Sequence, residues 1–123
     1  MSAQPQHVFF GTSLDEWMTG YTHELEDDIV GLWQIVPTLR KGFGLTGDAL
    51  ESATRKVMIS LLDRGAHPIT GSTDKPDAWK RVTRYGQNPM DIADSVIAEW
   101  RASGHDPDFG DVWFGLPGTY FEE

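Results

Sequence analysis

The chain has 123 residues, contains no cysteine and carries a formal net charge of −9. This length predicts a single domain with one hydrophobic core, and the lack of cysteine excludes disulfides, thiolate metal sites and a thiol nucleophile. The most apolar stretch, residues 29–36, is far shorter than the roughly 18 residues that a membrane span needs. We therefore expect a soluble, cytoplasmic protein that does not span a membrane.

The charges are divided into three blocks along the chain. Residues 1–39 contain six acidic and no basic residues, residues 40–84 contain nine basic and five acidic residues, and residues 85–123 contain eight acidic residues and one arginine. The overall excess of negative charge repels nucleic acid and anionic lipid at long range and favours basic partners. This division is the main functional clue in the sequence.

The N-terminal third is predicted to contain two helices. Residues 1–12 are expected to form an extended lead, and residues 13–123 a single domain. The capping-box sequence Ser13-Leu14-Asp15-Glu16 predicts the start of a short helix near 14–22. A second helix over 25–36 is predicted because apolar residues recur there at helical spacing. These residues are Leu25, Ile29, Leu32, Trp33 and Val36.

Proline and glycine residues are expected to end the helices in the next segment. Pro37 is expected to end or kink the second helix, and residues 37–46 are expected to form a glycine-containing loop. A third helix over 47–64 follows Thr46 as its N-cap, and Gly65 ends it. The buried face of this helix is predicted to contain Leu50, Ala53, Val57, Met58, Leu61 and Leu62.

The remaining elements are two or three strands and a fourth helix. Residues 66–70 and 79–85 are predicted strands on either side of a turn-rich segment. Asn88 followed by proline predicts a helix start, because asparagine caps a helix and proline suits its first position. Gly104 ends this helix, and residues 112–116 form a last short strand.

These elements together predict an α+β fold. We expect a helix-dominated small single domain of three to four helices with a small two- or three-stranded antiparallel sheet. The order of three helices followed by strand, turn and strand over residues 14–85 is also that of a winged-helix domain. A winged-helix-like arrangement is therefore a more specific form of the same prediction.

One glycine-rich segment matches a nucleotide-binding pattern. Gly42-Phe43-Gly44-Leu45-Thr46-Gly47 has the spacing G-x-G-x-x-G and leads into a helix, where backbone amides can approach a pyrophosphate. The residues before it have helical periodicity, whereas a dinucleotide site requires a strand there. The ordinary interpretation is an interhelical turn, and a small enzyme or nucleotide binder that uses the Gly42–Gly47 loop is the alternative.

No set of residues in the sequence predicts catalysis, a metal site or a cofactor. An acidic loop carries His105, Asp106, Asp108 and Asp111, but a calcium loop counted from Asp106 would need glutamate at the position of Pro117. His23 and Asp27 have the spacing of two residues on one helix face, which is too few ligands for a metal. Serine-hydrolase, zinc-protease and phosphate-loop motifs do not occur.

The first functional hypothesis is a small acidic protein-interaction module of the immunity, antitoxin or regulator kind. Such a module would have no catalytic activity of its own and would bind a basic protein, because complementary charge speeds encounter and selects the partner. Tryptophan beside cationic residues is common at binding hot spots. The predicted interaction residues are Glu24, Glu26, Asp27, Asp28, Asp106, Asp108, Asp111 and Trp79.

The second hypothesis is a winged-helix-like regulator that binds nucleic acid through the basic segment 40–84. Its phosphate-binding residues would be Arg55, Lys56, Lys75, Lys80, Arg81 and Arg84. The net negative charge opposes this hypothesis. A further alternative is that the basic middle pairs with the acidic ends inside the fold, where each surface pair contributes about 0–1 kcal/mol.

Overall fold

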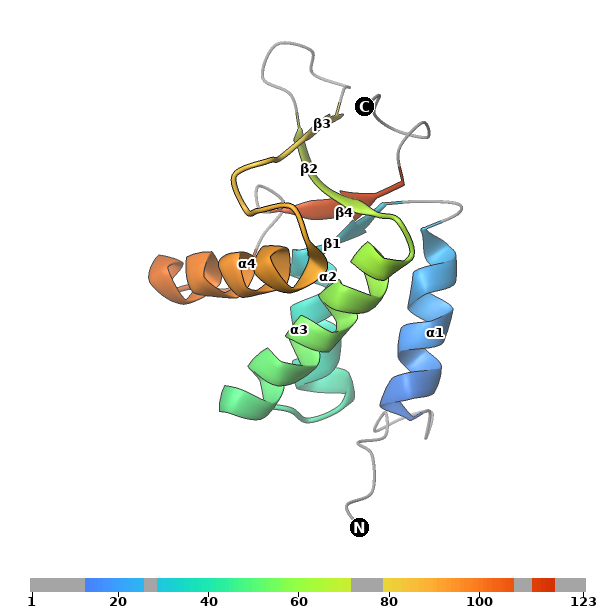
Figure 1. Ribbon diagram of the computed structural model, residues 1–123. Helices are drawn as coiled ribbons and strands as arrows, with labels where there is room; N and C mark the ends of the chain where they lie inside the picture. The colour runs from blue at the N-terminus through green and yellow to red at the C-terminus, as the bar shows by residue number, and fades with distance from the viewer. Residues whose placement is uncertain (1–12, 26–28, 72–78, 108–111, 117–123) are drawn as a thin grey trace.

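The computed structural model describes residues 13–25, 29–71, 79–107 and 112–116 (Figure 1). Helices and short strands alternate along these segments. Their bounds are α1 (Leu14–Glu24), β1 (Val30–Gly31), α2 (Leu32–Pro37), the π-helix η1 (Thr38–Gly42), α3 (Gly47–Asp63), β2 (His67–Gly71), β3 (Trp79–Arg81), α4 (Pro89–Ser103) and β4 (Trp113–Gly115).

The described strands form one antiparallel sheet in the order β1-β4-β2-β3. The helices gather on one side of this sheet (Figure 1). The predicted α+β class is therefore confirmed, and the sheet has one strand more than the three expected. The last strand along the chain, β4, lies in the middle of the sheet, between β1 and β2.

Alternating side chains of the sheet separate the core from an outer face. Val30 and Pro68 are the register partners of Phe114 on β4, and all three are buried on the side of the helices. Their neighbours on the outer face are Gly31, Trp113 and Ile69, which are also in register. Because successive residues of a strand point to opposite faces, Trp113 lies on the face away from the helices.

Local signals fix the two longest helices. α3 buries Thr54 in addition to all six apolar residues predicted from its spacing. α4 begins at the predicted cap, where the Asn88 side chain accepts a hydrogen bond from the Asp91 amide at 2.9 Å. It ends at Gly104, whose φ of +72° is the left-handed conformation that glycine adopts without strain. The two helices pack against each other.

The second predicted helix, over 25–36, is wrong at Val30 and Gly31, and residues 26–28 lie outside the described part of the chain. Val30 and Gly31 form β1, and α2 begins only at Leu32. Strand pairing explains the difference, because both residues pair with β4 and the Leu32 amide extends the ladder by donating to the Val112 carbonyl at 3.0 Å. Leu25 is fully buried as expected, but it lies just beyond α1.

The predicted loop at 37–46 is also wrong in its first half. Pro37 ends α2, and the chain then continues as the π-helix η1. Two apolar residues four positions apart, Leu39 and Phe43, are buried here, and Phe43 packs on Trp17 with ring centroids 5.6 Å apart. Burial of these side chains holds the segment in helical form. The strand predicted at 79–85 is shorter than expected and ends at Arg81.

Candidate interaction surfaces

Three arginines of the basic segment bind carboxylates of the acidic C-terminal part. Arg40 binds both oxygens of Asp106 through Nη1 and Nη2, at 2.5 and 2.8 Å. Arg55 donates from Nε to Asp94 Oδ1 at 2.7 Å, and Arg84 Nη2 lies 3.0 Å from Glu99 Oε2. The positive middle of the chain is thus joined to its negative end inside the fold.

The Arg84 contact is part of a small hydrogen-bonded cluster. The hydroxyl of the buried Tyr85 donates to Glu99 Oε1 at 2.8 Å, and the Arg84 guanidinium lies 4.5 Å from the centre of the Tyr85 ring. The hydrogen bond to Glu99 raises the pKa of Arg84 above its ordinary value. These contacts hold the turn after β3 against α4 at Glu99.

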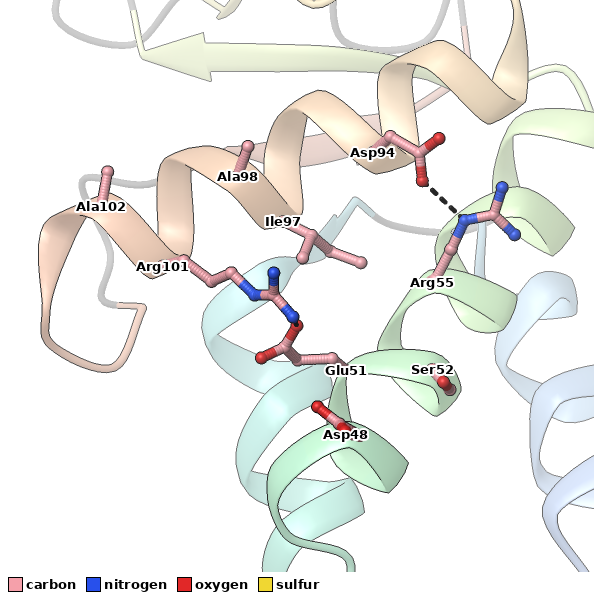
Figure 2. Close-up of a pocket in the computed structure, with 9 residues that line it drawn as sticks. All are labelled: Asp48, Glu51, Ser52, Arg55, Asp94, Ile97, Ala98, Arg101 and Ala102. Atoms are coloured by element: carbon pink, nitrogen blue, oxygen red, sulfur yellow. Dashed lines mark hydrogen bonds and ion pairs between the residues drawn. The ribbon is translucent and has the colours of Figure 1, made fainter.

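A groove of about 730 Å³ lies between α3 and α4 (Figure 2). The wall from α3 carries Asp48, Glu51, Ser52 and Arg55, and the wall from α4 carries Asp94, Ile97, Ala98, Arg101 and Ala102. Two ion pairs connect the walls, Arg55 with Asp94 and Arg101 with Glu51. Ile97 lies between these two pairs (Figure 2).

The groove continues beyond the Arg101–Glu51 pair. A second hollow of about 250 Å³ shares both of these residues and is also lined by Arg40, Trp100 and the segment 104–106. The hydrogen bond that Arg101 donates to Glu51 raises the pKa of Arg101. The hydrogen bond from Arg40 lowers the pKa of Asp106. In both cases the pairing stabilises the charged form of the group.

The pairs at the two ends of the groove present their carboxylates to solvent. The exposed fraction of the side chain is 62% for Asp94 against 33% for Arg55, and 57% for Asp106 against 34% for Arg40. In the middle pair the arginine is the more exposed member, since the Arg101 side chain is 63% exposed and the Glu51 side chain 24%. The groove therefore has outward carboxylates at its ends and an outward guanidinium at its centre.

A second surface is formed by tryptophans on the outer face of the sheet. Trp113 of β4 packs edge to face on Trp79 of β3, with centroids 5.4 Å apart, and on Trp33 of α2, at 6.0 Å. All three side chains are half-buried. Gly31 lies beneath this cluster, and only a residue without a side chain fits there. Trp79, which the sequence singled out, thus belongs to an aromatic row.

The predicted acidic contact residues are only partly within the described structure. Asp106 is exposed and bound to Arg40. Glu24 is the last residue of α1, but its side chain lies outside the described part, as do residues 26–28 and both Asp108 and Asp111.

Five of the six residues of the nucleic-acid hypothesis lie within the described structure, on α3, on β3 and in the turn after β3. Arg55 and Arg84 bind carboxylates of α4. Lys56 is exposed on α3, Lys80 and Arg81 are exposed on β3, and Lys75 lies outside the described residues. The structure does not bring these cations together at the α3–α4 groove, where Arg55 alone of them contributes.

The glycine-rich segment follows a helix, as its periodicity indicated. Gly42 is the last residue of η1, and Gly44 and Gly47 have φ values of +69° and +55°. These conformations make the tight turn into α3. Within the described segments, no three His, Asp or Glu side chains are grouped as metal ligands would be, and none of the helices described has the length and apolarity of a membrane span.

Sequence reasoning missed most of the groove. Asp48, Ser52 and Arg55 recur at helical spacing on α3, and Asp94, Ile97 and Arg101 do so on α4. This helical spacing of mostly charged residues is a signal in the sequence that could have indicated the groove. Comparison with protein-family models, with curated proteins and with solved structures finds no match to this chain.

Proposed function

We propose that the protein is a small acidic interaction module that binds a basic protein and has no catalytic activity of its own. The observation that carries this proposal is the pairing of the basic segment. Three of the nine basic residues of this segment, Arg40, Arg55 and Arg84, are paired with carboxylates of the same chain. The excess of nine negative charges then determines what the protein attracts.

The exposure of the paired carboxylates supports the same proposal. Asp94 and Asp106 are more than half exposed although each is bound to an arginine. A carboxylate has about four acceptor sites, so each can accept further hydrogen bonds from a partner's lysine or arginine. The tryptophan row offers apolar contact of the kind found at binding hot spots. A cytoplasmic location would suit a chain without cysteine.

Nucleic-acid binding is the weaker proposal, because two of its six cations are bound to carboxylates. A phosphate would have to compete with these carboxylates for the guanidinium groups. Titration with short duplex DNA at low and moderate salt tests it directly. Binding with a steep dependence on salt would favour nucleic acid over a protein partner.

Affinity capture followed by reconstitution tests the main proposal. The immobilised chain is exposed to lysate of its native host, and each captured protein is purified and titrated against the chain by calorimetry. We expect a partner of basic isoelectric point, a defined stoichiometry and an affinity that falls as salt is added. The variant with Glu24, Glu26, Asp27 and Asp28 changed to lysine serves as the charge-reversed comparison. If the reconstituted partners are acidic, or bind equally at all salt concentrations, the proposal is wrong.

A further inference from the structure

We propose that the groove between α3 and α4 binds a cationic amphipathic helix. The inference rests on the proposed function and names the part of the basic partner that this chain recognises. Helix binding in a groove requires a sufficient length, an apolar floor and rim charges that complement the ligand. The described residues supply each of these.

The groove is long enough for several helical turns. The groove and the adjoining hollow share Glu51 and Arg101, and together they follow α4 from Asp94 to its C-cap, Gly104. Ten residue steps at about 1.5 Å each give a length of about 15 Å. A ligand helix lying along α4 would therefore contact it over about ten residues, or roughly three turns.

The apolar surface of the groove comes from α4. Ile97 lies between the Arg55–Asp94 and Arg101–Glu51 pairs, and Ala98 and Ala102 are exposed on the α4 wall with their methyl groups directed away from α3 (Figure 2). The short alanine side chains allow another helix to approach α4 closely. Trp100, half-buried in the adjoining hollow, adds an aromatic surface at the far end. Apolar residues at positions i, i+3 or i+4, and i+7 of a ligand helix could contact these side chains.

Four carboxylates and three guanidiniums line the groove and the adjoining hollow, and this small excess of negative charge favours a cationic helix. The outward carboxylates of Asp94 and Asp106 mark the two ends of the groove, and Asp48 adds an exposed carboxylate on the α3 side. Arg55 binds only one oxygen of Asp94, Oδ1. A lysine of the ligand can therefore bind the other oxygen without breaking the existing pair.

Arg101 is expected to affect binding of the ligand helix in the opposite direction to the aspartates. Its guanidinium is the exposed member of the middle pair, so it repels a cationic ligand at the centre of the groove. Removing this charge leaves Glu51 available to the ligand. Substitution of Arg101 by an uncharged residue should then strengthen binding of the cationic helix. Substitution of Asp48, Asp94 or Asp106 should weaken it.

The probe is a synthetic helix of leucine and lysine labelled with a fluorophore, and its leucine–glutamate counterpart is the charge control. Fluorescence anisotropy measures the affinity of each peptide for the full chain. We expect saturable binding of the leucine–lysine helix and none of the leucine–glutamate helix. Equal binding of both peptides, or binding of neither, would overturn the proposal.

Four variants locate the binding site. Asp48→Asn should weaken binding about threefold and Arg101→Gln should strengthen it about threefold, as expected for single charge contacts at a surface. The matched controls are Asp63→Asn, the exposed last residue of α3, and Lys80→Gln on β3, neither of which lines the groove. Each control makes the same change in net charge, so affinity should change less than in its groove counterpart. Circular dichroism and urea unfolding verify that all four variants fold.

The outcomes separate this inference from the proposed function. If each groove variant behaves like its control, the peptide is attracted by the overall charge and the groove is not the binding site. The proposed function would survive that result, because it depends on the captured basic partner. If no basic partner can be reconstituted but the groove variants differ from their controls, the groove binds cationic helices and the proposed function is wrong.

Discussion

Replacement of Gly31 by alanine should destabilise the protein by crowding the tryptophan row. The backbone of Gly31 has φ −96° and ψ 145°, a conformation that alanine adopts without strain. A β-carbon at this position would lie 2.6 Å from Trp33 Cδ1 and 2.9 Å from Trp113 Cε3. The expected effect is therefore steric and involves two indole rings at once.

The size of the effect follows from these distances. Carbon atoms in favourable contact are about 3.5–4.0 Å apart, so both rings would have to move by up to about 1 Å. Trp113 also packs on Trp79, and its shift would be transmitted to β3. Overpacking of this kind typically costs about 1–3 kcal/mol. The amide that donates to the Gln34 side chain at 3.0 Å is retained in alanine, so loss of that bond does not contribute.

Urea unfolding followed by tryptophan fluorescence, together with near-ultraviolet circular dichroism, measures the result. Gly20→Ala is the control, because a β-carbon at Gly20 in α1 meets no atom within 4 Å. Alanine there should stabilise the helix by about 0.5–1 kcal/mol. The two substitutions thus have opposite expected signs. A Gly31→Ala protein with the stability and aromatic dichroism of the wild type would refute the described packing of Trp33 and Trp113.

Three further predictions concern hydrogen bonds and ion pairs. Asn88→Ala removes the acceptor for the Asp91 amide and should cost about 1 kcal/mol in urea unfolding; an unchanged midpoint would show that this cap does not stabilise α4. Tyr85→Phe removes the donor to Glu99 and should lower the free energy of unfolding by about 0.5–1.5 kcal/mol, whereas Thr83→Ala, at an exposed neighbouring position, should have little effect. Arg40→Gln should cost at most about 1 kcal/mol at neutral pH, because the ion pair is exposed. Since Arg40 lowers the pKa of Asp106 in the folded state, this stabilisation is present above the ordinary aspartate pKa and is lost as the pH falls through the lowered value. The difference between wild type and Arg40→Gln should therefore shrink in acid, and a difference that grows would contradict the assignment.

Elements with local signals could be predicted from the sequence. The cap at Asn88, the glycine stop at Gly104 and the apolar spacing of α3 all depend on residues within a few positions of one another. β1 could not be predicted, because Val30 and Gly31 are extended only through pairing with β4, far along the chain. The apolar periodicity of 25–36 therefore predicted a helix at two residues that a non-local strand pairing holds in extended form.

The candidate groove illustrates the same limit at the level of a site. Arg40 and Asp106 are 66 residues apart, and Arg55 and Asp94 are 39 apart. The three charge blocks indicated that internal pairing could occur. Which arginine meets which carboxylate depends on how η1, α3 and α4 pack together, and this packing is set by the whole core. Spacing within one helix cannot specify it.

The position of β4 has a consequence for synthesis on the ribosome. This strand is made after β1, β2 and β3, yet it separates β1 from β2 in the finished sheet. Until Trp113–Gly115 emerge, the facing backbone edges of Val30 and Ile69 lack the neighbour that both require. Unpaired strand edges are prone to pair with other chains, so these edges stay at risk until Trp113–Gly115 have been made, and the sheet can close only after that point.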